Sequence, residues 1–182
     1  MDVVLITGNK NKAKYFSKYM EINIEQIDLN LEEIQSLDLK EIIAHKAKQA
    51  HEQVGRPVIV EDVALEFKTL GKLPGPFIKF FLQELTMEEI CDLLKNKSRA
   101  ALARCIIGYY DGKDMQLFEG ELSGTISTEP RGDREFGWDK IFIPDGYEVT
   151  RSEMNDEDYK KTYLQIRRLD LLKNHINAKS KE

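Results

Sequence analysis

The sequence predicts a mixed α/β or α+β domain, in which a mixed sheet is flanked by helices. Short apolar runs of strand periodicity alternate with stretches of helical spacing, without the regular repetition that βαβ units would give. A chain of 182 residues, 41% hydrophobic and 32% charged, is large enough to bury one core without disulfides or a structural metal. We therefore expect a single domain over residues 1–177 and a polar tail at 178–182.

The expected elements follow one another with recognisable boundaries. Strand patterns cover residues 2–8, 22–31, 58–60, 100–110, 115–127 and 140–143. Helical spacing covers residues 13–20, 38–54, 86–95 and 155–174.

Individual boundaries have local causes. The run 2–8 is apolar on both faces, which predicts a strand inside a sheet. Asp38 is the expected N-cap of the second helix, and Gly55 is its expected stop. Asp111-Gly112 lies between two alternating apolar runs, which predicts a hairpin. The segment 131–139 is too polar and too rich in glycine to form a regular element.

Composition excludes several classes of protein. The formal net charge of −5 argues against binding to a nucleic-acid backbone, which needs a basic face. No apolar run approaches the roughly 18 residues that a membrane span needs. Cys91 and Cys105 form no CxxC motif, and no secretory signal precedes the first strand, so we expect buried thiols in a reducing cytoplasm. The three histidines are too scattered along the sequence for a zinc site.

The segment from Thr7 to Lys12 has the pattern of an anion site. A strand, a glycine turn at Gly8 and a helix start follow one another, which is the geometry that points free backbone N–H groups at an anion. Lysines add positive charge, but the P-loop spacing is absent. A simple capped helix start with solvated lysines explains the same residues.

Two adjacent carboxylates, Glu61 and Asp62, follow the short β-branched run 58–60. A carboxylate pair at a strand end can hold a metal or act as a general base, or it can be solvated. Together with Glu33, several lysines and the rings of Phe136 and Trp138, these acids suit a nucleotide polyphosphate with its Mg²⁺.

Four motifs in order resemble the inosine/xanthosine triphosphate pyrophosphatase family, over residue 3 to about 154. They are Thr7-Gly8-Asn9 with Lys12, the pair Glu61-Asp62, Leu73-Pro74-Gly75-Pro76-Phe77-Ile78-Lys79, and Phe136-Gly137-Trp138-Asp139 followed by Ile141-Phe142 and Pro144. The resemblance implies an elongated mixed α/β fold, usually a homodimer. It also implies Mg²⁺-dependent hydrolysis of non-standard purine nucleoside triphosphates, such as ITP, dITP and XTP, to the monophosphate and pyrophosphate.

The same resemblance implies roles for individual residues. Asp62 would hold Mg²⁺ and orient or deprotonate the attacking water, with Glu61 and Lys12 beside it as catalytic residues. Glu33 would be a second metal ligand. The residues expected to bind substrate are Thr7, Gly8, Asn9, Lys10, Asn11, Lys12, Lys46, Lys79, Phe136, Gly137, Trp138, Asp139 and Gln165. Among them, Phe136 would stack on the base and Lys79 would reach a phosphate.

The chain departs from the family where the base is read. The family has a Ser-His-Arg run near the start of its last helix, preceded by a lysine; this chain has Tyr163-Leu164-Gln165 there, and Tyr159 at the lysine position. Lys140 replaces a common proline, and Val63-Ala64 replace a common Ser-Gly. Losing a hydrogen-bonding reader changes discrimination between bases by orders of magnitude.

Three interpretations remain open at the level of sequence. The first is a working pyrophosphatase with altered base choice, in which Gln165 presents a donor and an acceptor to the base. The second is a standard inosine triphosphate enzyme in which a nearby cation replaces the missing reader, the candidates being Lys160, Lys161, Arg167 and Arg168. The third is a catalytically silent nucleotide-binding or regulatory protein on the same fold.

Overall fold

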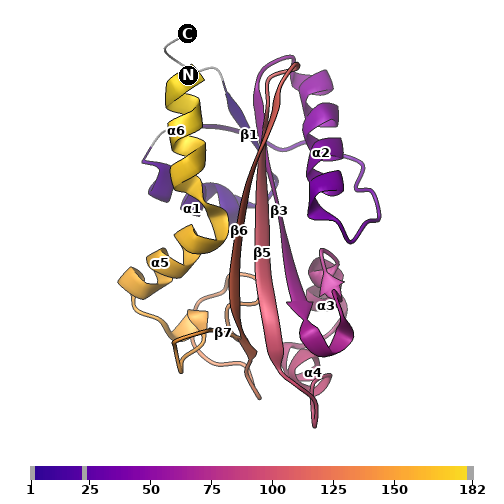
Figure 1. The fold of residues 1–182 in the computed structure, drawn as a ribbon, viewed down its shortest axis with the longest axis vertical. Helices are drawn as coiled ribbons and strands as arrows, with labels where there is room; N and C mark the ends of the chain where they lie inside the picture. The colour runs from indigo at the N-terminus through magenta and orange to yellow at the C-terminus, as the bar shows by residue number, and fades with distance from the viewer. Residues whose placement is uncertain (1–2, 22–23, 180–182) are drawn as a thin grey trace. The chain divides into compact units, whose positions relative to one another are not determined.

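The computed structural model describes residues 3–21 and 24–179, and Figure 1 shows its ribbon. The chain forms two compact units. The described parts of unit 1 come from Met1–Asp62, Cys105–Gly120 and Arg167–Glu182, and unit 2 comprises Val63–Arg104 and Glu121–Ile166. No described helix is long and apolar enough to cross a membrane.

The predicted mixed sheet flanked by helices is confirmed. Within the described residues the sheet has seven strands in the order β2-β1-β3-β5-β6-β7, with β4 paired to β3. The strands are β1 (Val4–Ile6), β2 (Glu25–Ile27), β3 (Val58–Phe67), β4 (Pro74–Gly75), β5 (Ala100–Tyr110), β6 (Met115–Ile126) and β7 (Phe142–Pro144). β1 pairs in parallel with β2 and β3, whereas β4 and β7 pair antiparallel with β3 and β6.

In unit 1, β1 lies between β2 and β3, with Val4 opposite both Glu25 and Val58. This interior place explains why β1 is buried along its whole length, as its apolar sequence predicts. In Figure 1, α2 (Leu39–Val54) lies on one side of these strands, and α1 (Lys10–Met20) and α6 (Leu169–Lys179) lie on the other. β2 is shorter than the predicted strand 22–31, whose first two residues lie outside the described residues.

Both predicted caps of α2 are confirmed. The Asp38 side chain accepts a hydrogen bond from the N–H of Lys40, and Gly55 adopts a left-handed φ of 69° just past the helix end. The predicted hairpin of β5 and β6 is present, and the Asp111 side chain organises its turn by accepting from the N–H groups of Lys113 and Asp114. The two cysteines are buried thiols, as expected.

The predicted end of the third strand at Val60 is wrong. β3 continues through Glu61 and Asp62 to Phe67, so the two carboxylates lie in the middle of a strand. The reason is that the chain beyond them is apolar and buried again at Ala64, Leu65 and Phe67, while β4 pairs with Leu65 and Glu66. The two acids therefore interrupt the burial of the strand without ending it, and β3 is followed by a short 3-10 helix, Lys68–Leu70, with Gly71 at its C-cap.

The predicted single C-terminal helix is also wrong. The segment forms two helices, α5 (Asp156–Arg167) and α6, separated at Arg168, whose φ is 46°. The separate direction of α6 lets Leu169, Leu172 and Ile176 be buried, and α6 packs on α1. It also extends through Lys179, past the predicted start of a polar tail at residue 178; residues 180–182 lie outside the described residues.

In unit 2, two short helices, α3 (Ile78–Glu84) and α4 (Met87–Asp92), follow β4. Thr86 caps α4 in a capping box with Glu89, as its sequence position predicts, but the helix ends three residues before the predicted Lys95. β7 begins two residues later and ends one residue later than the predicted strand 140–143. Figure 1 shows α3 and α4 on one side of β5, and α5 and β7 on the other.

Candidate active site

The loop before α1 is held by short polar side chains. Asn9 is the N-cap, and its Oδ1 accepts hydrogen bonds from the N–H groups of Asn11 (3.0 Å) and Lys12 (3.1 Å). Thr7 Oγ1 accepts from the N–H of Asn9 at 3.1 Å. Two N–H groups of the first helical turn are therefore satisfied within the loop, and the predicted anion site depends chiefly on the positive charge of its lysines.

Gly8 leaves room for a carboxylate that the sequence did not point to. A Cβ at Gly8 would lie 2.6 Å from Oδ1 of Asp28 and 2.9 Å from its Oδ2, which is closer than real Cβ contacts. Gln26 fixes the same loop, because its Nε2 donates to the carbonyl oxygen of Thr7 at 2.7 Å. A side chain at position 8 would thus force the Asp28 carboxylate to move, so the glycine here is explained by close approach of a side chain and not by an unusual φ.

Glu61 is buried between two cations. Its Oε1 lies 3.4 Å from Nζ of Lys12 and its Oε2 lies 3.1 Å from Nε of Arg167; the side chains of Glu61 and Arg167 are 5% and 4% exposed. Burial alone would raise the pKa of Glu61, but the charges of Arg167 and then Lys12 outweigh it and lower that pKa below its ordinary value. The carboxyl is therefore ionised at neutral pH.

Asp62 belongs to a second charge cluster. Its Oδ2 accepts a hydrogen bond from Nζ of Lys46 at 3.0 Å, and Oε1 of Glu33 lies 3.3 Å from the same nitrogen. Burial would lower the pKa of Lys46, but Asp62 and then Glu33 raise it above its ordinary value. Lys46 is thus a charged ammonium that links two carboxylates, and its side chain is only 15% exposed.

The two carboxylates of β3 point in different directions. Successive side chains of a strand leave on opposite faces of the sheet, so Glu61 and Asp62 cannot act as one carboxylate pair. Glu61 meets cations from α1 and from the end of α5, whereas Asp62 meets the lysine of α2. The structure brings together the predicted residues Lys12 and Glu61 in one cluster, and Glu33, Lys46 and Asp62 in the other.

The second cluster has the chemistry of a magnesium site. Two carboxylate oxygens already converge on one cation, and Glu33 is 47% exposed and accessible to solvent. Within the described residues there is no group of three or more Asp, Glu, His or Cys side chains that could enclose a metal. Mg²⁺ commonly takes one or two carboxylates and completes its shell with water and substrate phosphates, so Glu33 and Asp62 fit it.

In unit 2, Asp139 is held inside the protein. It is 3% exposed; its Oδ2 accepts a hydrogen bond from the hydroxyl of Tyr159 at 2.7 Å, and its Oδ1 pairs with Nε of Arg151 at 3.0 Å. The ring of Tyr159 in turn has the guanidinium of Arg134 at 4.5 Å and that of Arg151 at 4.8 Å from its centroid. The predicted contact of Asp139 with substrate therefore competes with two strong internal partners.

The other members of the 136–139 motif form a turn that presents two rings. Phe136 is half-buried, with its centroid 6.5 Å from that of Tyr163, and Gly137 adopts a left-handed φ of 56°. Trp138 is half-buried too, and its Nε1 is a buried donor with no hydrogen-bond partner in the described part of the chain. An aromatic ring can stack on a flat heterocycle, and an unused N–H donor beside it can bond to an acceptor on the edge of that heterocycle.

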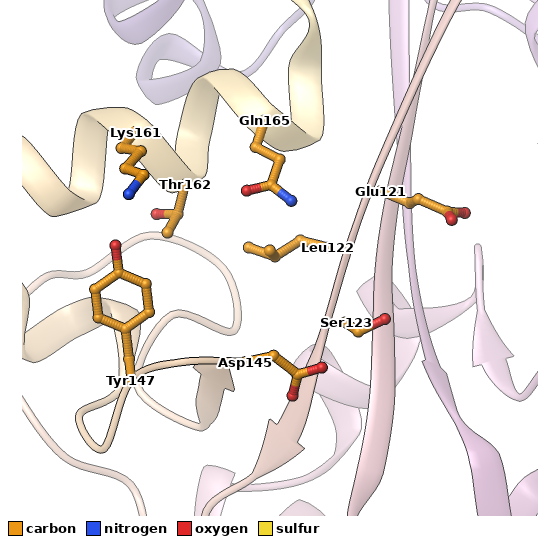
Figure 2. Close-up of a pocket in the computed structure, with 8 residues that line it drawn as sticks. All are labelled: Glu121, Leu122, Ser123, Asp145, Tyr147, Lys161, Thr162 and Gln165. Atoms are coloured by element: carbon orange, nitrogen blue, oxygen red, sulfur yellow. The ribbon is translucent and has the colours of Figure 1, made fainter.

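Gln165 and Lys79 have surroundings of their own. Figure 2 shows Gln165 pointing its amide into a cavity of about 480 Å³ lined by Glu121, Leu122, Ser123, Asp145, Tyr147, Lys161, Thr162 and Gln165. None of residues 136–139 lines it. Residues 163 and 165 are 200° apart around a helix, so Gln165 faces away from the side on which Tyr163 meets Phe136. Lys79 is exposed in the first turn of α3, with its ammonium 5.8 Å from the ring centroid of Phe80.

Two residues of the site were not predicted in their observed places. Arg167 was considered only as a replacement base reader, yet it is the buried partner of Glu61. Its position four residues after the buried Tyr163 puts it on the inner stripe of α5, where a charged residue signals a buried partner. Asp28 beside Gly8 had no signal of this kind, because it lies in an irregular segment.

Comparisons with known proteins agree with this architecture. Residues 3–174 match the model of the Ham1 family. The chain is 37% identical to an inosine triphosphate pyrophosphatase of Scheffersomyces stipitis, covering 96% of this chain and 97% of that one. It is 39% identical to inosine triphosphate pyrophosphatase 2 of Trypanosoma cruzi, covering 96% and 91%.

Solved structures share the fold. A HAM1 protein from Coxiella burnetii superposes with a TM-score of 0.80 at 22% identity, over 98% of this chain and 100% of that one. A nucleoside-triphosphatase (dITP/XTP pyrophosphatase) from Mycobacterium abscessus superposes with a TM-score of 0.76 at 20% identity, over 94% and 98%. With a family match over residues 3–174 and relatives at this identity over nearly their full length, the chain belongs to the Ham1 family.

Proposed function

We propose that this protein hydrolyses a nucleoside triphosphate to the monophosphate and pyrophosphate, with Mg²⁺, and that its substrates are non-standard purine nucleotides such as ITP, dITP and XTP. The observation that carries the proposal is the cluster of Glu33, Lys46 and Asp62, two carboxylates joined by one charged lysine. Relatives similar over nearly their full length are named inosine triphosphate pyrophosphatases, which supports the same reaction here.

Asp62 and Glu33 would hold Mg²⁺, which when bound would neutralise charge on the phosphoryl oxygens. Asp62, as the less exposed of the two acids, would also orient or deprotonate the water that attacks the α-phosphorus. Lys46 lies within hydrogen-bond reach of Asp62 and would donate to a phosphate oxygen as negative charge develops there. Its pKa above the ordinary value keeps it charged for this role.

The triphosphate would be gripped by the loop before α1. Lys12 supplies charge in the first turn of the helix, and Lys10 and Asn11 are exposed beside it. Thr7, Gly8 and Asn9 would shape the loop rather than carry charge, because Thr7 and Asn9 already accept hydrogen bonds from the loop's own N–H groups. We include Lys79 as a further phosphate contact, because it is an exposed ammonium that follows the Gly/Pro loop.

The base would stack on Phe136, with Gly137 allowing the turn and the unused Nε1 donor of Trp138 close by. We propose that base choice is relaxed or altered. Tyr159 donates its hydroxyl hydrogen to Asp139, Leu164 has no hydrogen-bonding group in its side chain, and Gln165 lines a cavity to which none of residues 136–139 contributes. A pocket that lacks readers discriminates weakly between bases that differ by one exocyclic group.

Four further properties belong to the same proposal: one domain over residues 1–177, a homodimer, a cytoplasmic location and no binding to nucleic acid. The net charge of −5 supports the last, and buried, unpaired cysteines are compatible with a reducing compartment.

A panel of triphosphates tests the function. Purified protein is incubated with ITP, dITP, XTP, ATP and GTP in MgCl₂ or in EDTA, and pyrophosphate and orthophosphate are measured separately. We expect equal amounts of monophosphate and pyrophosphate, loss of turnover in EDTA, and turnover of ITP and XTP above that of ATP by less than about 100-fold. No release from any nucleotide would point to the silent nucleotide-binding alternative, and release of orthophosphate would contradict the proposed bond cleavage.

A further inference from the structure

Within the described residues two cations contact the carboxylate of Glu61, so these three side chains together carry one surplus positive charge. Lys12 and Arg167 approach separate oxygens of one carboxylate, Lys12 at 3.4 Å from Oε1 and Arg167 at 3.1 Å from Oε2. Lys12 is 21% exposed, whereas Glu61 and Arg167 are almost fully buried. The buried pair is therefore close to neutral, and the surplus charge belongs to the residue that reaches solvent.

We propose that Arg167 is a positioning residue for the triphosphate loop: by neutralising Glu61 from the inside, it leaves the charge of Lys12 free for an anion. This inference rests on the proposed function, because it gives Lys12 a phosphate to bind. Arg167 itself is too deeply buried to be the phosphate ligand, and it acts through Glu61.

The positions of Lys12, Glu61 and Arg167 in the fold support these separate roles, in which Arg167 neutralises Glu61 and Lys12 binds the anion. Lys12 is in the first turn of α1, where the positive end of the helix dipole favours anions. Arg167 is the last residue of α5, and the left-handed residue Arg168 redirects the chain immediately after it. The break between α5 and α6 thus occurs where the guanidinium reaches Glu61, 106 residues away in sequence.

Without Arg167, the same arrangement of Glu61 and Lys12 would weaken the binding of a polyphosphate. Glu61 would remain as a buried carboxylate with one cation, and Lys12 would be attracted to both of its oxygens. The cluster would then be neutral overall and would offer less attraction to a polyphosphate. Removing Glu61 as well would restore a surplus of one positive charge, now carried by Lys12 alone.

The test measures binding of inorganic tripolyphosphate by calorimetry, in MgCl₂, to the full chain and four variants. Arg167→Gln is expected to weaken binding by about tenfold. Glu61→Gln/Arg167→Gln is expected to bind within about threefold of the unchanged protein, and Glu61→Gln alone is expected to bind more tightly. The matched control is Arg168→Asn, which removes the neighbouring, 40% exposed arginine and keeps a residue that tolerates left-handed backbone; its binding should not change.

The outcomes separate a charge effect from a structural one. If the double variant binds as weakly as Arg167→Gln, or if Glu61→Gln binds more weakly than the unchanged protein, the inference is overturned. If Arg167→Gln does not fold, comparing Glu61→Gln with the double variant still tests the inference. Glu61→Gln keeps the charge of Arg167 and must bind tripolyphosphate more tightly than the double variant. Absence of tripolyphosphate binding by the unchanged protein would also overturn it.

The same data keep this inference separate from the proposed function. The expected order of tripolyphosphate affinities, combined with no nucleotide turnover, would leave the role of Arg167 standing and remove the enzymatic activity. If the unchanged protein hydrolyses nucleotides and the Arg167→Gln variant binds tripolyphosphate as tightly as the unchanged protein does, the enzymatic activity stands and the role of Arg167 is removed.

Discussion

Among single residues, Asp62 is the one whose substitution is expected to affect hydrolysis most. Asp62→Asn keeps the shape of the side chain but removes its charge, and with it the proposed metal ligand and base. We expect kcat to fall by about 10²–10⁴-fold while the melting temperature stays nearly unchanged, because the side chain is partly exposed. Steady-state kinetics and thermal unfolding measure the two effects.

The matched control for this prediction removes a different acid of unit 1. Glu119 pairs with Lys40 at 2.8 Å, and both side chains are more than 40% exposed. Glu119→Gln should leave kcat within twofold of the unchanged protein, since surface ion pairs contribute little. An Asp62→Asn variant that retained more than a tenth of the activity would remove Asp62 from its proposed role.

The candidate residues could largely be named from sequence, but their partners could not. Glu33, Lys46 and Asp62 come from three separate segments, and the family resemblance pointed to each of them. The pairing of Glu61 with Arg167 could not be predicted, because it joins residues 106 positions apart and Arg167 is the last residue of α5, next to a helix break that has no local signal. The opposite orientation of Glu61 and Asp62 was missed because the strand was expected to end before them.

At the scale of elements, the hairpin of β5 and β6 has a turn stabilised by one carboxylate. Asp111 Oδ1 accepts from the N–H of Asp114 at 2.8 Å and of Lys113 at 3.0 Å, and Oδ2 lies 3.3 Å from Nζ of Lys179. The hydrogen bond from Asp114 is the largest cause that lowers the pKa of Asp111 below its ordinary value of 3.8. The folded hairpin therefore stabilises the ionised form of Asp111.

The sign of the pH effect follows from this shift. A lowered pKa in the folded state contributes stability that is complete above the ordinary pKa and is lost as pH falls through the folded value. We expect Asp111→Asn to be less stable than the unchanged protein at pH 5, with the difference in urea midpoint shrinking as pH falls below 3.8 toward the lowered pKa.

Asp114→Asn is the control, since it changes a neighbouring, more exposed acid that lies 3.9 Å from the same lysine. Its urea midpoint should stay close to that of the unchanged protein at each pH. A constant gap between Asp111→Asn and the unchanged protein over the whole range would contradict the assignment of the shift to Asp111.

Elements with local signals were predicted well, and elements set by packing were not. Caps at Asp38, Gly55 and Thr86 and the Asp111-Gly112 turn fixed the bounds of their elements, because each is a short-range interaction. The length of β3 depends on its pairing with β4, and the break at Arg168 accompanies the burial of the apolar residues of α6. Nothing in the immediate sequence of Arg168 marks a helix end, since neither glycine nor proline occurs there.

At the scale of the whole molecule, each unit contains one buried thiol. Cys105 belongs to unit 1 and Cys91 to unit 2, and both are fully inaccessible. Burial is the main cause that raises the pKa of each thiol, well above the ordinary value for Cys105. We expect neither thiol to react with Ellman's reagent in the native protein at pH 8, because the thiolate is the reacting form.

Single-cysteine variants then measure whether the units unfold together. Cys91→Ala leaves the thiol of unit 1, and Cys105→Ala leaves the thiol of unit 2. Since β3, β5 and β6 contribute residues to both units, we expect the two thiols to become reactive at the same urea concentration. Midpoints that differ once the effect of each substitution on stability is subtracted would contradict the proposal of one domain.

The turn at residues 136–139 also has an optical consequence. Trp138 is the single tryptophan of the chain, so all indole fluorescence of the protein originates in this turn. Its N–H has no internal acceptor in the described residues, which leaves its emission sensitive to whatever heterocycle or water molecule arrives beside it. Trp138 is therefore an intrinsic fluorescent probe in the turn where base choice is expected to be decided. Binding of a base there can be measured by tryptophan emission, without an attached dye.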